Sequence, residues 1–452
     1  MMGPKQVAQA SLFYRFSVED HVPSDHLLRR IDRFVDLSDT RRFLAPYYSS
    51  TGRPSIDPEL MIRMLIAGYC FGIRSERRLC DEVHLNLAYR WFCRLDLTDP
   101  VPDHSTFSKN RHGRFRDCDL FRHLFEQVLA RCIAEGLVGG DSFGVDASLI
   151  SADACRFEKI EPEEWAPEKI TRAAQEYLDT LDDAAFGAAT PVTPKALSPS
   201  DPAARFTAAN GDRPFYAYST NYLVDLQHAV IVDVEATAPI RQAEAGAAMD
   251  MIVRTRERFG LYPEKLVADT AYGSAETLGW LVESEGIEPH IPVTDKSQRK
   301  DGTFSREDFT FDKARDIYIC PAGEVLRTTG TVSTDHAVRY IAPVPVCRAC
   351  PFKPKCCPNM PARRVLRDVN EDARDVARRL AKTEAFERSC RDRKRVEMLF
   401  AHLKRILRLG RLRLRGPRGA QDEFTLAAIA QNLRRLAKFV ARSPPQASAC
   451  VA

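Results

Sequence analysis

Three acidic residues, far apart in the chain, have the sequence surroundings of a site for divalent metal ions: Asp146, Asp269 and Glu397. Asp146 lies in the strand-like apolar run Phe143–Ile150, and Asp269 ends another such run that begins at Lys265. In mixed sheets, acids at strand ends face the crevice in which ligands bind. Mg²⁺ prefers oxygen ligands, and three carboxylates can hold two ions about 3.5–4 Å apart on a phosphodiester. The three acids therefore predict chemistry at phosphorus.

Glu397 belongs to the basic stretch Cys390–Arg415, where ten Lys or Arg residues accompany two acids. Apolar residues recur there at three- and four-residue steps, which predicts an amphipathic helix packed on a core. They are Val396, Leu399, Phe400, Leu403 and Leu407. At about 100° per residue, Arg393, Glu397 and Lys404 share the neighbouring stripe, so cations flank the carboxylate. A solvated basic helix with one ion-paired Glu explains the same pattern.

Taken singly, each aspartate is weak evidence, because an acid at a strand end is more often a cap or a surface group. Four further acids lie close to the two strands in sequence and compete for the same role: Asp141, Asp153, Asp225 and Asp233.

Residues 1–136 predict a helical domain. Asp57 followed by Pro58 marks one helix start, Ser75 marks a second, and Asp103 or Ser105 marks a third. Basic residues gather near these starts, namely Arg74, Arg77, Arg78, Lys109, Arg111 and Arg114. They suit a helix-turn-helix-like contact with DNA, although a plain helical bundle with a solvated basic rim fits equally well.

Residues 137–295 predict a mixed sheet with helices on both faces, since strand-like runs first follow one another and then alternate with helices. The expected hairpin is 215–224 with 229–236, the long helix spans 241–259, and short strands lie at 265–269 and 288–293. Residues 158–183 are acidic and helical in pattern. Residues 184–205 are rich in Ala, Pro, Ser and Thr and predict an exposed linker.

Residues 296–370 interrupt this order with a polar, Cys-rich segment. Cys320, Cys347, Cys350 and Cys356 can form a tetrahedral structural Zn²⁺ site, which would let a small segment fold without a large core of its own. Cys357 is then surplus. A set of reduced cysteines in a basic loop is the alternative.

Residues 371–452 contain the basic helix and a last apolar helix, 424–440. Between them, Arg411, Arg413 and Arg415 alternate with Leu, so an extended backbone would place their guanidinium groups on one face. Such a row suits contact with DNA phosphates.

The composition, with 44% hydrophobic and 28% charged residues in 452, is that of a globular protein of two to four domains. The net charge is only +4, but 391–415 alone carry +8, which favours a polyanionic partner such as nucleic acid. The N-terminus lacks the apolar core of a signal peptide, and no run is long enough to span a bilayer. We therefore expect a cytoplasmic protein with no membrane association, whose scattered cysteines are reduced.

The chain resembles the DDE transposases of bacterial insertion sequences over nearly its full length. The matching segments are FGVDAS around Asp146, VADTAYGS around Asp269, and two N-terminal stretches, YSSTGRPSIDPELMIRMLIAGYCFGIRSERRL and PVPDHSTFSK. In many relatives the last catalytic helix reads tyrosine, two residues, arginine, three residues, glutamate, six residues, lysine. Arg393, Glu397 and Lys404 match this spacing, whereas Cys390 stands in the tyrosine position.

The resemblance implies an RNase H-like fold in which Asp146, Asp269 and Glu397 bind Mg²⁺ or Mn²⁺, while Arg393 and Lys404 hold DNA phosphates. It also implies double-stranded DNA partners, both terminal inverted repeats and target DNA, cleavage followed by strand transfer, and a homodimer that handles two ends together. A non-cutting regulator of transposase descent and an RNase H-like nuclease without strand transfer are the alternatives. The sequence does not define the terminal repeats, the target preference or the excision route.

Overall fold

The computed structural model describes residues 16–52, 54–166, 170–182, 194, 196–208, 213–294, 299, 301–334 and 336–440. Its contacts divide the chain into two compact units. Unit 1 comprises Met1–Gly139, Ala147–Gly260 and Glu397–Ala452, and unit 2 comprises Gly140–Asp146 and Leu261–Val396. Both units mix helices with strands, which confirms the predicted mixed α/β class. The predicted division of the chain into residues 1–136, 137–295, 296–370 and 371–452 stays a prediction.

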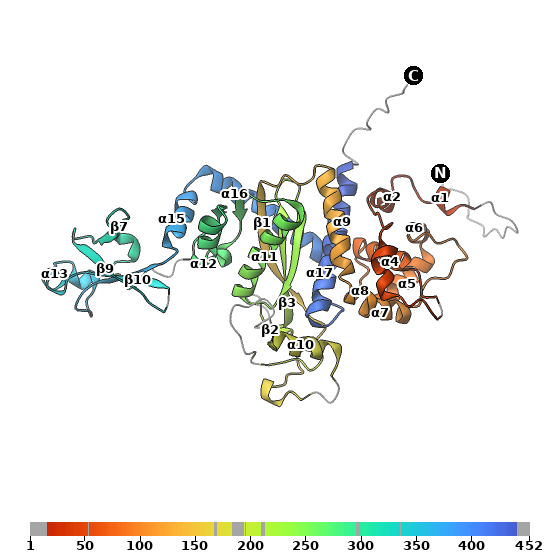
Figure 1. The fold of residues 1–452 in the computed structure, drawn as a ribbon, viewed down its shortest axis with the longest axis horizontal. Coiled ribbons are helices and arrows are strands. Elements are labelled where there is room, and N and C mark those ends of the chain that lie inside the picture. The colour runs from red at the N-terminus through yellow and green to blue at the C-terminus, as the bar shows by residue number, and fades with distance from the viewer. Residues whose placement is uncertain are drawn as a thin grey trace, which may run out of the picture. The chain divides into compact units, whose positions relative to one another are not determined.

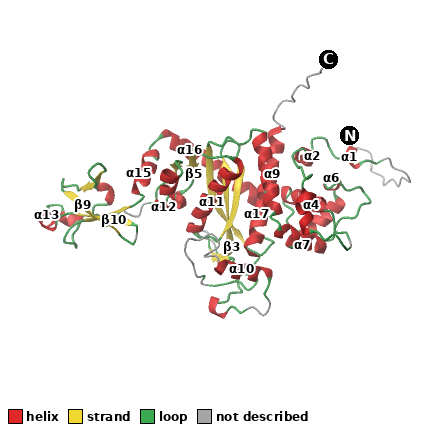
Figure 2. Cartoon of the chain, in the orientation of Figure 1, coloured by secondary structure: helices red, strands yellow, loops and turns green. Residues whose placement is uncertain are grey.

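The N-terminal part of unit 1 is helical (Figure 2). Its helices are α1 (Val18–His21), α2 (Leu27–Asp32), α3 (Thr40–Leu44), α4 (Pro58–Cys70), α5 (Glu76–Leu85), α6 (Leu87–Phe92), α7 (His104–His112), α8 (Arg114–Asp117) and α9 (Leu120–Ala134), with a 3₁₀ turn at Ala45–Tyr47. Three predicted starts are confirmed, because Asp57, Ser75 and Asp103 each accept a hydrogen bond from the first helical turn. The pattern of residues 76–93 predicts a single helix after Ser75. This prediction is wrong, because α5 ends at Leu85 and the Asn86 side chain caps a new helix, α6.

The strands of unit 1 are β2 (Arg205–Thr207), β3 (Phe215–Asp225), β4 (Val230–Thr237) and the second half of β1 (Ser142–Ser151). The antiparallel pairing of β3 with β4 confirms the predicted hairpin. Every residue of β3 after Phe215 is buried, because helices cover both faces of the strands. Figure 1 shows α11 (Arg241–Phe259) and α17 (Gly416–Val440) on opposite sides of these strands, and both pack against β4.

Helix α17 completes the hydrogen bonding of β4 with two of its side-chain amides. Asn432 accepts from the Ile231 N–H at 2.9 Å and donates to the Ile231 carbonyl at 2.8 Å. Gln421, about three turns earlier on the same face, accepts from the Ala236 N–H at 2.7 Å and donates to the Val234 carbonyl at 3.2 Å. The helix begins at Gly416 rather than at the predicted residue 424, so its first turns reach this part of the strand.

Two described parts of unit 1 lie near the predicted linker. Helix α10 (Arg172–Asp182) forms within the predicted helical run, after a 3₁₀ turn at Pro162–Glu164. The exposed linker expected at 184–205 is wrong for its described end, because Leu197 and Asp201 are buried. Leu197 forms a β-bridge with Ile160, and Asp201 accepts a hydrogen bond of 2.7 Å from the Tyr218 hydroxyl. Residues 183–193 and 195 lie outside the described residues.

The first half of β1 belongs to unit 2, where it pairs in parallel with β5 (Lys265–Val267), and β5 pairs in parallel with β6 (Glu288–His290). The connections contain a 3₁₀ turn at Thr270–Tyr272, α12 (Ala275–Gly279) and a π turn at Trp280–Ser284, followed later by α15 (Glu371–Leu380). Helix α16 (Glu384–Arg405) then crosses from unit 2 into unit 1.

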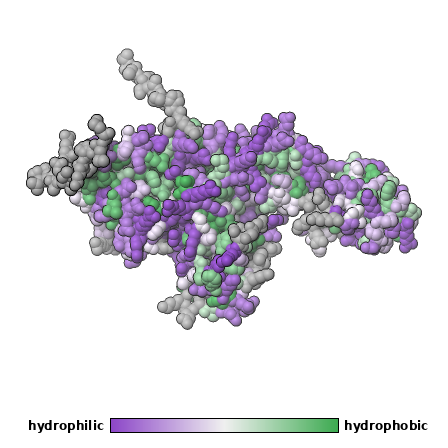
Figure 3. Space-filling view, turned by 180° about the vertical axis from the view of Figure 1, so that it is seen from behind, coloured by the Kyte–Doolittle hydropathy of each residue, from purple (hydrophilic) through white to green (hydrophobic). Residues whose placement is uncertain are grey.

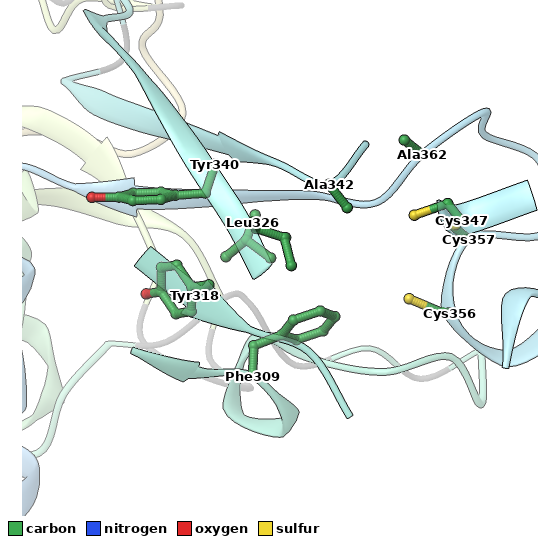
Figure 4. Close-up of a cluster of buried hydrophobic side chains, with 10 residues drawn as sticks. Phe309, Tyr318, Leu326, Tyr340, Ala342, Cys347, Cys356, Cys357 and Ala362 are labelled. Carbon is green, nitrogen blue, oxygen red and sulfur yellow. The ribbon is translucent and has the colours of Figure 1, made fainter. Parts of the chain in front are cut away.

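A second sheet of unit 2 lies within the segment predicted to be Cys-rich. Its antiparallel strands run in the order β11-β10-β9-β8-β7. The elements are β7 (Thr310–Asp312), β8 (Ile317–Ile319), β9 (Val325–Val332), β10 (Ala337–Ile341), α13 (Val344–Ala349), α14 (Lys353–Cys356) and β11 (Arg364–Asp368), after a 3₁₀ turn at Arg306–Asp308. This sheet has a core of its own, built around Phe309, Tyr318, Leu326 and Tyr340 (Figure 4).

Among the described helices, none combines the length and the apolar character needed to cross a membrane. On the face drawn in Figure 3, hydrophobic residues form separate patches among hydrophilic ones.

Candidate active site

Asp146 lies in the middle of β1, and Asp269 lies just after the end of the neighbouring strand β5 in unit 2, so the strand-end position expected from the sequence is wrong for Asp146. The parallel register of β1 and β5 pairs Gly144 with Val267, and each aspartate follows its paired residue by two positions. Because side chains alternate along a strand, two residues in matched register point to the same face. In β1, Phe143, Gly144 and Val145 are buried and Asp146 is half-buried. The structure therefore brings the two predicted aspartates together.

The backbone around Asp269 holds its carboxylate at the start of a turn. The side chain accepts a 2.8 Å hydrogen bond from the Ala271 N–H and caps the 3₁₀ turn that follows. Its other oxygen lies 4.0 Å from a guanidinium nitrogen of Arg393. With 37% of its side chain exposed, Asp269 keeps oxygen surface that a ligand can reach. Arg393 is thus a cation beside Asp269, a neighbour that the sequence did not predict.

Helix α16 presents the predicted third carboxylate. The stripe formed by Val396, Leu399, Phe400, Leu403 and Leu407 is buried, which confirms the predicted amphipathic helix. Glu397 is exposed and follows Arg393 by one helical turn on the same face. Lys404 and Cys390 are also exposed. Glu397 belongs to unit 1 and the aspartates to unit 2, so the complete triad is a proposal.

Of the four competing acids, Asp153, Asp225 and Asp233 bind other groups. Asp141 is exposed just before β1. Asp153 binds Arg411 and Arg415, with a nitrogen to oxygen distance of 3.0 Å in each pair. Asp225 accepts hydrogen bonds from the backbone N–H groups of residues 139 and 227. Asp233 is buried and forms ion pairs with two arginines, residues 122 and 254. Three of the four therefore have structural roles of their own.

Two of the three arginines predicted to bind DNA phosphates, Arg411, Arg413 and Arg415, are already paired with an acid. Arg411 and Arg415 are each about half exposed and share the Asp153 carboxylate, so they lie on one side of the segment as predicted. Arg413 is also exposed, while its backbone N–H donates a 2.5 Å hydrogen bond to buried Glu423. Their role in DNA binding stays a prediction.

Two of the basic residues assigned to a DNA-contacting rim are buried, so that assignment is wrong for them. Arg74 is 8% exposed and forms an ion pair with Glu423 of α17. Arg111 is 2% exposed, and its guanidinium binds Glu76 at 3.2 Å and the Tyr69 hydroxyl at 2.9 Å. Burial lowers the pKa of Arg74 despite its ion pair. These guanidinium groups hold α4, α5 and α17 together within unit 1 and do not face solvent.

Five cysteines line one small cavity of about 20 Å³ in unit 2: Cys320, Cys347, Cys350, Cys356 and Cys357. Figure 4 shows the sulfur atoms of Cys347 and Cys356 pointing toward the buried cluster. Burial and the neighbouring Cys357 thiol raise the pKa of Cys356 to about 11. The scattered cysteines at 70, 93 and 132 are buried small hydrophobes, as predicted, and burial raises the pKa of each to about 12.

No three His, Cys, Asp or Glu side chains within the described ranges are arranged so that they could hold a metal ion. The aspartate pair and the cysteine cavity both have suitable donor atoms, hard oxygens in one case and soft sulfurs in the other. Each would need a further ligand or a side-chain rotation to close around an ion.

The sequence did not predict that α17 binds distant parts of unit 1 through a buried acid. Glu423 is fully buried and binds Arg74 as well as the backbone N–H groups of Arg413 and Leu414. The available signal was an acid directly before the apolar run 424–430, because a buried acid requires partners. The cations of α17 at 434, 435 and 438 recur on one side of the helix, a second signal that was not used.

Two family models match the sequence. The model described as "Transposase domain (DUF772)" matches residues 16–113, and the model described as "Transposase DDE domain" matches residues 319–437. The protein is therefore a transposase by class. More particularly, the chain belongs to the DDE-type transposases. Glu397 falls inside the second matched range, whereas Asp146 and Asp269 lie between the two ranges.

Among solved structures, a similar chain occurs in the complex described as "Cryo-EM structure of piggyBac transposase synaptic complex with hairpin DNA (SNHP)". The two chains are 10% identical with a TM-score of 0.30, over 94% of this chain and 81% of that one. A TM-score this low does not show that the two chains share a fold. Among curated proteins, no sequence matches the chain significantly.

Proposed function

We propose that this transposase binds the ends of a mobile DNA element and catalyses cleavage and transfer of DNA strands at a site formed by Asp146, Asp269 and Glu397. The observation that supports the proposal is the β1–β5 register, because Asp146 and Asp269 each follow the last printed residue pair, Gly144 with Val267, by two positions. The position of Arg393 beside Asp269 adds a cation suited to a phosphate.

The carboxylates would hold Mg²⁺ or Mn²⁺, because hard divalent cations take oxygen ligands and leave room for water and phosphate. Bound metal ions at such a site activate the attacking oxygen and stabilise the leaving oxygen of an in-line displacement. The chain's own contribution is positional. The strand register fixes Asp146, the capped turn fixes Asp269, and α16 carries Glu397 one turn from Arg393.

Several finer features belong to the same proposal. They are an RNase H-like sheet, recognition of terminal inverted repeats, capture of target DNA and a homodimer on the DNA. Arg393 and Lys404 would contact phosphates next to the reacting bond, and Arg411, Arg413 and Arg415 would contact phosphates farther away. Phosphate contacts of this kind position the duplex and do not read its sequence.

The test is incubation of the full chain with Mg²⁺ and duplexes carrying the DNA that flanks the gene, with cleaved and joined products separated on a denaturing gel. We expect Asp146→Asn, Asp269→Asn and Glu397→Gln each to lower product formation by at least about 10³-fold, since each removes a ligand charge at the reacting phosphate. DNA affinity should change little.

Asp141→Asn is the matched control, because it removes an exposed acid five residues before Asp146 and should leave cleavage unchanged. Cleavage at the wild-type rate by any of the three variants would remove that residue from the site.

The same assay separates two other functions. Binding without Mg²⁺-dependent nicking by the wild-type chain would indicate a regulator that no longer cuts. Nicking without joined products would indicate a nuclease of the same fold.

We also infer a structural zinc site at Cys320, Cys347, Cys350 and Cys356, which line one cavity together with Cys357. The cavity volume, about 20 Å³, suits a single ion, and rotation of the thiols would have to bring them to zinc–sulfur distances of about 2.3 Å. Since the second sheet has a hydrophobic core of its own, zinc would add to the stability of the fold without being its only source.

A further inference from the structure

A cationic groove of about 450 Å³ lies in unit 1 between α2, α16 and α17. Its lining contains five basic side chains, and none of the described residues that line it is acidic. They are Arg30 of α2, His402 of α16, and Arg434, Arg435 and Lys438 of α17. Two helices far apart in the sequence, α2 and α17, therefore direct four cationic side chains into one concave surface, and α16 adds the imidazole of His402.

The groove also holds polar atoms that lack partners. Arg30 Nε and His402 Nδ1 are buried and have no hydrogen-bond partner in the part of the chain that the structure describes. Arg30 Nε carries a hydrogen and is therefore a buried donor without a partner, which is unfavourable and which an anionic ligand would satisfy. Arg434 is already fixed in place, since one of its guanidinium nitrogens donates a 2.9 Å hydrogen bond to the Cys70 carbonyl.

The positive potential of the groove acts on His402. Burial lowers the pKa of His402, and the charges of Arg434, Arg435 and Lys438 lower it further. Burial and the neighbouring cations thus both disfavour the protonated form of the His402 imidazole. A bound anion would relieve this repulsion, so the groove is electrostatically prepared for a negative ligand.

The spacing of the cations suits a polymer of phosphates. Arg434 and Lys438 are four residues apart on one face of α17, about 6 Å along the helix axis. This distance covers the rise of about two nucleotides in one strand of duplex DNA. We propose that this groove binds the phosphodiester backbone of double-stranded DNA, a second contact region in addition to the residues assigned to the cleavage site.

This inference rests on the proposed function, because it assigns a DNA-binding role to a surface of the same transposase. A double variant, Arg435→Ala with Lys438→Ala, tests it. Alanine keeps the helix propensity of α17, and neither change touches the Arg434 hydrogen bond to Cys70. The matched control is Arg42→Ala with Arg258→Ala, which removes the same charge from side chains of unit 1 that are 86% and 63% exposed and lie outside the groove.

The measurement is binding of the full chain to a 30-base-pair duplex in EDTA, over a series of salt concentrations. We expect the groove variant to bind about tenfold more weakly at 100 mM salt, and its slope of log K against log salt to fall by about 1.8. The control should keep the wild-type slope, and both variants should keep the wild-type thermal midpoint.

An unchanged slope and affinity in the groove variant would overturn the inference. Weaker binding to single-stranded RNA or to polyglutamate, with unchanged binding to the duplex, would overturn it too. These outcomes are distinct from failure of the proposed function, which would appear as absent Mg²⁺-dependent cleavage by the wild-type chain whatever the groove binds.

Discussion

At the scale of single residues, partners distinguish a candidate catalytic acid from a structural one. Asp153 and Asp233 are acids beside the same strands as Asp146, yet each binds two arginines. Asp269 also has a cation nearby, but at 4.0 Å and with a third of its side chain exposed. A carboxylate that is exposed beside one cation can still accept a ligand. A carboxylate that is paired with two arginines instead holds structural elements together.

The zinc inference gives a prediction at this scale. Purified full chain should contain about one zinc ion, and Cys347→Ser or Cys350→Ser should lower both the zinc content and the thermal midpoint, because a lost thiolate weakens a tetrahedral site. Metal analysis by mass spectrometry and a melting curve measure the two effects.

Cys390→Ser is the matched control for that experiment, since Cys390 is an exposed thiol outside the cavity. Less than one zinc per chain, together with unchanged melting of the Cys347 and Cys350 variants, would refute the zinc site.

At the scale of elements, α17 acts as a cover for the edge of β4. The register of β3 with β4 shifts next to Leu223, and Asn432 of α17 pairs with both backbone groups of Ile231 at this irregularity. A side-chain amide can do this because it presents a donor and an acceptor at once, as a neighbouring strand would. The helix thereby protects the strand edge from pairing elsewhere.

Asn432→Leu should therefore lower the free energy of unfolding by about 2–4 kcal/mol, because it leaves two buried backbone groups of Ile231 without partners. Urea denaturation followed by circular dichroism measures the loss.

Gln175→Leu, which changes an exposed amide on α10, is the control and should cost less than about 0.5 kcal/mol. Equal stability of the Asn432→Leu and control proteins would show that the amide does not support β4.

At the scale of the whole molecule, unit 1 joins the start and the end of the chain. Glu423 of α17 binds Arg74, which follows α4, and the Tyr69 hydroxyl donates to the same carboxylate at 3.5 Å. Arg111 of α7 continues the network through Tyr69. Because the charges are buried, each depends on its partner. The helical N-terminal region is thus fixed to the C-terminal helix by ion pairs as well as by apolar packing.

Glu423→Gln should lower the free energy of unfolding by about 3–5 kcal/mol, because it leaves the Arg74 charge buried without a counterion. The double variant Arg74→Met with Glu423→Leu should recover part of that loss, since it removes both charges. Chemical denaturation of the single and double variants measures the coupling.

Glu161→Gln removes an exposed acid from unit 1 and should leave the unfolding free energy within about 0.5 kcal/mol of wild type. A double variant less stable than Glu423→Gln would contradict the proposed coupling.

The sequence by itself determined the features that depend on neighbouring residues. Asp57, Ser75 and Asp103 cap helices that begin directly after them, and the bounds of α11 agree with its periodic pattern. The hairpin of β3 and β4 and the position of Asp269 after a strand end also followed from local apolar runs, whereas Asp146 lies in the middle of β1. Caps and strands are readable because the atoms involved are only a few residues apart.

Only the tertiary structure decided which charges are buried and which face solvent. Arg74 looked like a rim cation, yet it binds a glutamate 349 residues later in the chain. The segment around Leu197 looked like a linker, yet it pairs with Ile160 and is buried. The groove at His402 needs α2, α16 and α17 at once. Each of these depends on contacts between distant segments, which no local pattern of residue types specifies.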